Sequence, residues 1–119
     1  MRALITSLLA VLLGIGLVAC APQSTIEVGD DTVVVDVRTP EEYASGHLEG
    51  AVNLDVQDPG FLAEVSELDP EADYVVYCRS GNRSAVAVSE MRGAGIEQVT
   101  DAGALQSAAG STGLPIVTE

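Results

Sequence analysis

Short runs of β-branched and other apolar residues alternate along this chain with segments of helical spacing. The apolar runs of strand length are residues 33–37, 51–54, 74–77 and 98–100. Helical spacing is found in residues 61–68 and 84–92, and glycines end the second segment. Thr39-Pro40-Glu41-Glu42 is typical of a helix start, with a capping residue, a proline in the first turn and acids favoured by the helix dipole. Strands that alternate with helices predict an α/β domain with a mainly parallel sheet.

The beginning of the chain predicts export rather than a folded element. A short positive start, Met1-Arg2, precedes twelve mainly apolar residues, 8–19, which end in small residues before Cys20. Leu17-Val18-Ala19-Cys20 resembles the lipobox of bacterial lipoproteins, in which the chain is cut before the cysteine and the thiol is lipidated. The apolar run is shorter than the ~20 residues of a spanning helix. An uncleaved anchor helix and a secretory signal cut elsewhere remain alternatives.

We therefore predict three parts. Residues 1–19 are a signal peptide of the lipoprotein type, residues 20–25 are a lipid-anchored tether, and residues 26–119 form one domain. The protein would be extracytoplasmic, held by a lipid at Cys20 on the cell membrane or the outer membrane of a bacterium.

The charge of the mature chain excludes several partners. All five basic residues are arginines, and Arg2 leaves with the signal. Four arginines then face 18 acidic residues, which gives a formal charge of −14. Such a body repels nucleic acids and anionic lipid headgroups, so no nucleic-acid ligand is expected.

Cys78 is the cysteine that remains if Cys20 is lipidated. In an oxidising compartment it has no disulfide partner, so it is either a buried, inert thiol or a reactive one. Residues 78–84, Cys-Arg-Ser-Gly-Asn-Arg-Ser, join a predicted strand to a predicted helix, at the sheet edge where α/β proteins bind ligands. Converging backbone N–H groups and the helix N-terminus would stabilise a thiolate there, which lowers the pKa of Cys78 from ~8.5 towards neutrality.

The neighbours of Cys78 are assigned roles accordingly. Arg79 is predicted to face an anionic substrate, with a solvent-facing loop charge as the alternative. Arg83 either contacts the substrate or starts the helix and pairs with an acid. Ser80, Gly81 and Asn82 are predicted to act through their backbone, and Gly81 to shape the loop.

Three other polar residues are assigned structural roles. His47, the single histidine, is predicted to serve in a turn, because a thiolate that is already formed needs no general base. Asp36 and Arg38 end a strand, and a partly buried ion pair, such as Arg38 with Glu42, is favoured over substrate contact.

Two separated motifs resemble the rhodanese-homology domain, and the short exported members of the phage-shock type in particular. Residues 36–43 with 46–51 match the first signature of that family, and residues 77–84 match its active-site loop. The similarity spans about residues 32–105 and implies a three-layer α/β/α domain around a sheet of about five parallel strands. Residues 26–28 are a weak candidate for the first strand of the family. The last signature of the family is usually two glycines followed by an aromatic residue, whereas small residues follow Gly103-Ala104-Leu105 here.

The resemblance also implies ping-pong sulfur transfer. The Cys78 thiolate would take the outer sulfur of thiosulfate as a persulfide and pass it to cyanide, a thiol or a protein, with no metal or organic cofactor. Phosphatases of similar architecture place five residues between the cysteine and the arginine, whereas four separate Cys78 from Arg83. The smaller loop favours a single sulfur atom over a phosphate. A non-enzymatic sulfane-sulfur carrier, or a thiol-redox partner in the cell envelope, is the alternative.

Overall fold

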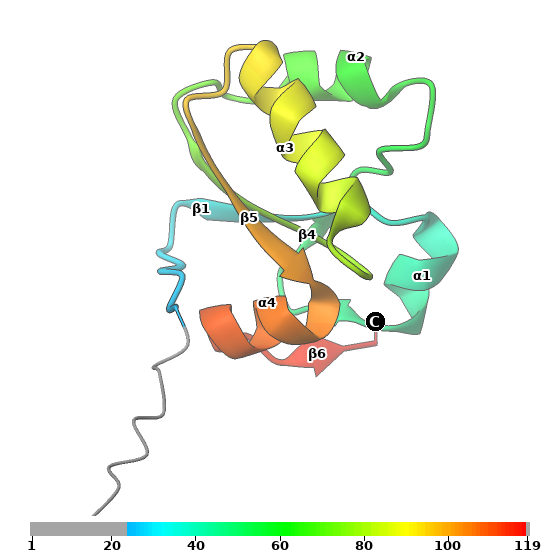
Figure 1. Cartoon of the computed structure of the whole chain (residues 1–119), viewed down its shortest axis with the longest axis vertical. Coiled ribbons are helices and arrows are strands. Elements are labelled where there is room, and N and C mark those ends of the chain that lie inside the picture. The colour runs from blue at the N-terminus through cyan, green and yellow to red at the C-terminus, as the bar shows by residue number, and fades with distance from the viewer. Residues whose placement is uncertain (1–23, 119) are drawn as a thin grey trace, which may run out of the picture.

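The computed structural model describes residues 24–118, in which a parallel sheet forms the centre of the molecule (Figure 1). Its four strands lie in the order β3 (Val52–Asn53), β1 (Thr32–Asp36), β4 (Asp73–Cys78) and β5 (Gln98–Ala104). A second, antiparallel pair joins β2 (His47–Leu48) to β6 (Ile116–Val117). The helices are α1 (Pro40–Ser45), α2 (Phe61–Ser66), α3 (Asn82–Gly93) and α4 (Leu105–Thr112). The predicted signal peptide and Cys20 lie outside the described residues.

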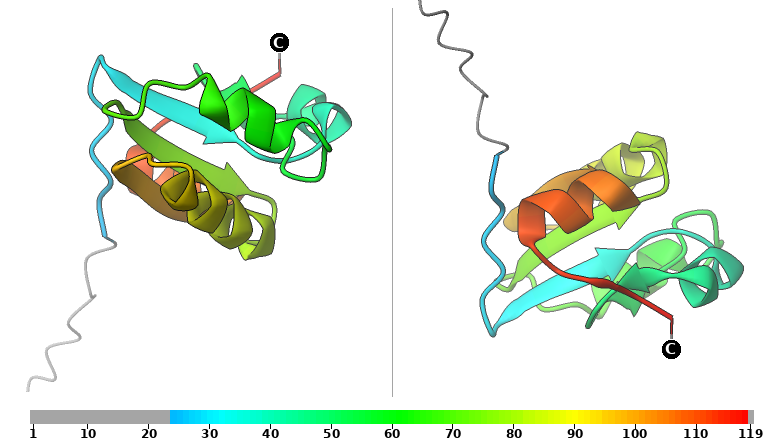
Figure 2. Two further views of the ribbon diagram at one scale, coloured as in Figure 1. Left: turned by 90° about the horizontal axis from the view of Figure 1, so that it is seen from above. Right: turned by 90° about the horizontal axis from the view of Figure 1, so that it is seen from below.

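Helices cover both faces of the sheet. α2 and α3 lie on one face, whereas α4 lies on the other face with the β2–β6 pair (Figures 1 and 2). The predicted three-layer α/β/α architecture and mainly parallel sheet are confirmed.

Two hydrophobic clusters, one on each face, explain the apolar runs. Along β4, Tyr74, Val76 and Cys78 belong to the cluster under α2 and α3. Val75 and Tyr77 alternate with them and belong to the cluster under α4. Because successive side chains of a strand point to opposite faces, a strand buried on both faces is apolar at every position.

The sheet differs from the expected one in its number of strands. It has four strands rather than about five, because residues 26–28 form no strand. The N–H of Ile26 donates to the carbonyl oxygen of Ser111 at 2.9 Å. Ile26 and Val28 pack against the cluster under α4. A turn at residues 30 and 31 leaves this stretch too short to continue into a ladder.

The C-terminal segment holds two elements for which the sequence pattern gave no prediction. α4 consists mainly of small residues, and Ala108 is its one fully buried member. Leu105, Ala108 and Ala109 face the core at helical spacing, but two of them are alanines, so the apolar pattern in the sequence is weak. None of the helices in the described part of the chain has the length and hydrophobicity of a membrane span.

Candidate active site

The candidate site lies where β4 passes into α3. β4 ends at Cys78, and α3 begins at Asn82, two residues before the start that was predicted at Ser84. Gly81 precedes the helix with a φ of +98°, a conformation that side chains with a Cβ rarely adopt. A Cβ at Gly81 would also lie 3.9 Å from the Cα of Gly103, so the loop curls closely against the end of β5. The predicted role of Gly81 in loop geometry is confirmed.

Polar groups surround the Cys78 sulfur, although the residue is fully buried. The N–H of Gly81 points at the sulfur with an N···Sγ distance of 2.9 Å, and the Ser84 Oγ lies 3.4 Å from it. Burial by itself raises the pKa of the thiol. The Ser84 hydroxyl and the N–H groups of Ser84, Gly81 and Ser80 outweigh that effect and lower the pKa of Cys78 below its ordinary value.

Ser84 ends the predicted loop, and the sequence assigned no role to its side chain, which contacts the sulfur. Its hydroxyl donates to the carbonyl oxygen of Gly81 at 3.0 Å and accepts from the Cys78 thiol. When Cys78 ionises, the same hydroxyl is free to turn and donate to the thiolate, because the Gly81 carbonyl keeps the N–H of Ala85 at 3.3 Å. Ser84 therefore follows the protonation state of the sulfur without leaving a buried group unpaired.

Arg83 pairs with an acid, which is one of the two alternatives considered for it. Its guanidinium donates two hydrogen bonds to the Glu42 carboxylate, at 2.7 and 2.9 Å. The Glu42 carboxylate also accepts from the backbone N–H of Thr39, and the N–H of Glu42 donates to the Thr39 hydroxyl, so the two residues form a capping box at the start of α1. Hydrogen bonding to Arg83 is the main reason that the pKa of Glu42 falls to about 2, although burial opposes it.

The predicted pairing of Arg38 with Glu42 is therefore wrong. Arg38 pairs instead with Asp36, at 2.7 Å, and both side chains are buried. Arg38 also donates to the carbonyl oxygen of Gly46, whereas Asp36 accepts from the Tyr77 hydroxyl. Asp36 is preferred because it lies inside the fold beside Arg38, whereas Glu42 lies at the start of α1 and reaches the loop.

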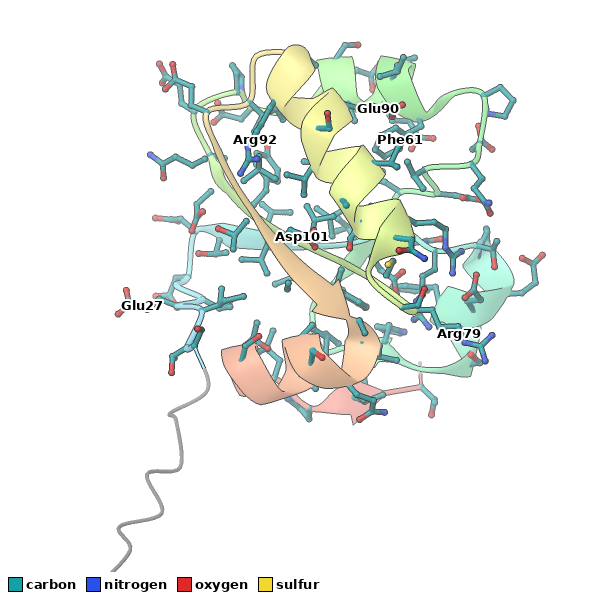
Figure 3. All side chains as sticks on the ribbon, in the orientation of Figure 1. Glu27, Phe61, Arg79, Glu90, Arg92 and Asp101 are labelled. Carbon is teal, nitrogen blue, oxygen red and sulfur yellow. The ribbon has the colours of Figure 1, made fainter. Side chains whose placement is uncertain are left out.

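Arg79, Ser80 and Asn82 form the exposed side of the loop. Among residues 24–118, Arg79 takes part in no ion pair. Figure 3 shows Arg79 beside the loop, whereas Arg92 lies towards the other end of α3. The position of Arg79 suits contact with an approaching anion.

The described residues contain no group of three or more His, Cys, Asp or Glu that is arranged to hold a metal ion.

His47 lies away from the sulfur chemistry. It is buried in β2, its Nδ1 is 2.8 Å from the carbonyl oxygen of Tyr43, and its ring stacks on the Tyr43 ring. These contacts agree with a structural role at the end of α1.

Removing the Ser84 hydroxyl tests the proton arrangement at the sulfur. In Ser84→Ala, we expect the pKa of Cys78 to rise, because the thiolate loses a donor. Thiolate reactivity at neutral pH should then fall about threefold to tenfold and recover as the pH is raised. The measurement is the pH dependence of alkylation and of thiolate ultraviolet absorbance. Ser80→Ala serves as the control, and identical pH profiles for wild type and Ser84→Ala would contradict this role.

This is an α/β protein that presents a buried cysteine to converging backbone N–H groups at the carboxyl end of a central strand. A model of the rhodanese-like domain matches residues 24–102, and the chain belongs to that family. Chloroplastic thiosulfate sulfurtransferase 16 of Arabidopsis thaliana is 36% identical over 68% of this chain and 76% of its own length. A sulfurtransferase of Allochromatium vinosum is 37% identical over 74% of this chain and 80% of its own. The solved structure of a rhodanese with anions from E. coli matches with a TM-score of 0.63 and 28% identity, over 74% of this chain and 99% of that one.

Proposed function

We propose that this protein is a thiosulfate-type sulfurtransferase that carries the transferred sulfur as a persulfide on Cys78. The observation that carries the proposal is the polar surroundings of the Cys78 sulfur, namely the N–H of Gly81, which donates to it at 2.9 Å, and the Ser84 hydroxyl at 3.4 Å, which accepts from the thiol and can turn to donate to the thiolate. These donors favour a negatively charged sulfur and need no general base. Relatives named thiosulfate sulfurtransferase and sulfurtransferase support the same reaction class.

In the first half-reaction, the Cys78 thiolate attacks the outer sulfur of thiosulfate. The S–S bond of thiosulfate breaks, its electron pair leaves with sulfite, and Cys78 keeps the outer sulfur as a persulfide anion. In the second half-reaction, the nucleophilic atom of cyanide, a thiol or a protein attacks that outer sulfur. The electron pair of the persulfide bond returns to Cys78, where the loop N–H groups again stabilise the thiolate. Because Cys78 is fully buried, the loop has to move for the donor to reach it.

Steady-state turnover tests this function directly. Purified protein supplied with thiosulfate and cyanide should release sulfite continuously, and intact mass after thiosulfate alone should rise by one sulfur atom. A single stoichiometric release without turnover would instead favour the sulfane-sulfur carrier. Absence of both the added sulfur and sulfite would refute the persulfide.

We also propose that the protein works outside the cytoplasm and is held at a membrane by a lipid on Cys20. The support is the sequence of residues 1–20, with its positive start, apolar run and lipobox-like end. Metabolic labelling with a fatty-acid probe should mark the wild-type chain, whereas Cys20→Ala should remain unlabelled and keep its leader. Equal labelling of the two chains would contradict lipidation at Cys20.

Replacing Arg79 tests how thiosulfate is held. In Arg79→Ala, kcat/KM for thiosulfate should fall about tenfold or more, because the dianion loses a charge-assisted contact of about 1.5–3 kcal/mol. Arg92→Ala is the matched control, since it removes the same charge from the other end of α3 (Figure 3). If both variants lose activity equally, the net charge of the protein, rather than a contact with Arg79, determines kcat/KM for thiosulfate. If neither changes, the loop N–H groups hold the anion.

A further inference from the structure

A small hollow lies directly beside the loop that holds Cys78. Its volume is about 290 Å³, and its lining residues come from two segments, namely Val56 and Gln57 before α2, and Asn82, Arg83 and Val86 in α3. Asn82 and Arg83 also belong to the predicted sulfur-binding loop. A molecule seated in the hollow would therefore touch the loop through the first turn of α3.

Apolar surface inside the hollow is left uncovered. Val86 is 53% exposed, whereas Ala87, Val88 and Met91 of the same helix are buried. Val56 packs partly on the core and lines the same hollow. An exposed valine and a half-buried one beside a reactive site offer contact area for an apolar side chain of a partner.

Two acidic residues are close along the chain to those that line the hollow. Asp55 and Asp58 flank Val56 and Gln57 along the chain, and each accepts a backbone N–H through its carboxylate, which fixes the turn. The nearby guanidinium of Arg83 is already neutralised by Glu42. Glu42 has the largest effect in raising the pKa of Arg83, and the charge of Asp55 adds to it. Beside the hollow, the single positive charge of Arg83 is therefore opposed by the negative charges of both Glu42 and Asp55.

Charge decides which partner fits. The whole chain has a formal charge of −13, so a second copy of it would be repelled. A thiol carried on an acidic protein would be repelled in the same way. A basic surface would be attracted and guided to the hollow before its cysteine meets the persulfide.

We propose that this hollow is the docking surface for a protein sulfur acceptor that presents a cysteine between apolar and basic residues. The inference rests on the proposed sulfur transfer and names its acceptor. The acceptor thiolate attacks the outer sulfur of the Cys78 persulfide and forms a new persulfide on the acceptor. The bond between the two sulfurs on Cys78 breaks, and its electron pair stays on Sγ.

Two synthetic peptides serve as probes of this surface. Each has one cysteine between leucines, and the flanking residues are lysines in one peptide and glutamates in the other. Persulfidated protein is mixed with each peptide at low salt, and the transfer rate is followed by the mass of the peptide persulfide. Because basic flanks also change the reactivity of the peptide thiol, the comparison is between wild type and variants with the same peptide.

Val86→Ser should slow transfer to the lysine peptide about tenfold, as expected for losing one valine contact. Leu62→Ser is the matched control, because Leu62 is 56% exposed on α2 and does not line the hollow. The double variant Asp55→Asn with Asp58→Asn keeps oxygen acceptors for the turn, and should slow the lysine peptide about threefold while leaving the glutamate peptide equal or faster.

Cyanide separates failure of this inference from failure of the proposed function. All these variants should release sulfite with thiosulfate and cyanide at the wild-type rate, because cyanide needs no docking surface. If wild type fails with cyanide, the sulfurtransferase proposal fails. If cyanide turnover is normal and Val86→Ser transfers to the lysine peptide as fast as Leu62→Ser does, the docking surface is refuted.

Discussion

Replacing Cys78 by serine is expected to abolish sulfur transfer completely. The serine hydroxyl is not ionised at neutral pH, and it forms no persulfide. Sulfite release from thiosulfate and the added sulfur in the intact mass should both disappear. The fold should survive, because serine is similar in shape to cysteine and can accept the N–H of Gly81 that now points at the sulfur.

The control for this result is Ser80→Ala in the same loop. The Ser80 side chain is exposed, and its N–H rather than its hydroxyl acts on the sulfur, so this variant should keep nearly wild-type turnover. Thermal unfolding of both variants shows whether the loop is intact. Near-normal turnover by Cys78→Ser would overturn the persulfide mechanism as a whole.

Asp36→Ala is expected to cause the largest loss of stability. Asp36 is fully buried and accepts hydrogen bonds from the Arg38 guanidinium and from the Tyr77 hydroxyl. Removing the carboxylate leaves the guanidinium of Arg38 buried without its counter-charge. The free energy of unfolding should fall by about 3–5 kcal/mol, measured by urea denaturation.

Asp31→Ala provides the comparison for that measurement. Asp31 is exposed in the turn before β1, so its removal should change the free energy of unfolding by no more than about 0.5 kcal/mol. A loss below about 1 kcal/mol for Asp36→Ala would show that Arg38 finds another partner or reaches water.

The elements of the site were predictable from local sequence. Apolar runs predicted β1 and β4, and Thr39 caps α1 as expected. The order of strand, glycine-containing loop and helix placed Cys78 at the carboxyl edge of the sheet, where the structure has it. Each of these inferences depends on residues that are only a few positions apart. Their relative positions are fixed by the local helix or strand conformation of the backbone.

Contacts between distant residues were not predictable in the same way. Glu42 and Arg83 are 41 residues apart, and their pairing depends on how closely α1 approaches the loop. The N–H groups of the loop were predicted to stabilise the thiolate, and they lower the pKa of Cys78 as expected, but the Ser84 hydroxyl that acts with them was not predicted. Ser84 reaches the sulfur only because α3 starts at Asn82, and helix boundaries are imprecise when they are inferred from periodicity.

Glu42 serves two structures with one carboxylate, since it caps α1 and holds Arg83 beside the loop. Its pKa is lowered to about 2, chiefly by Arg83, whereas an ordinary glutamate titrates near ~4.3. The stability that it contributes is therefore complete above ~4.3, decreases as the pH falls below that value, and is gone once the pH has fallen through about 2. Moderate acidification would protonate an ordinary glutamate while this carboxylate keeps its charge. In acid surroundings, the connection between α1 and the loop would outlast the protonation of an ordinary surface glutamate.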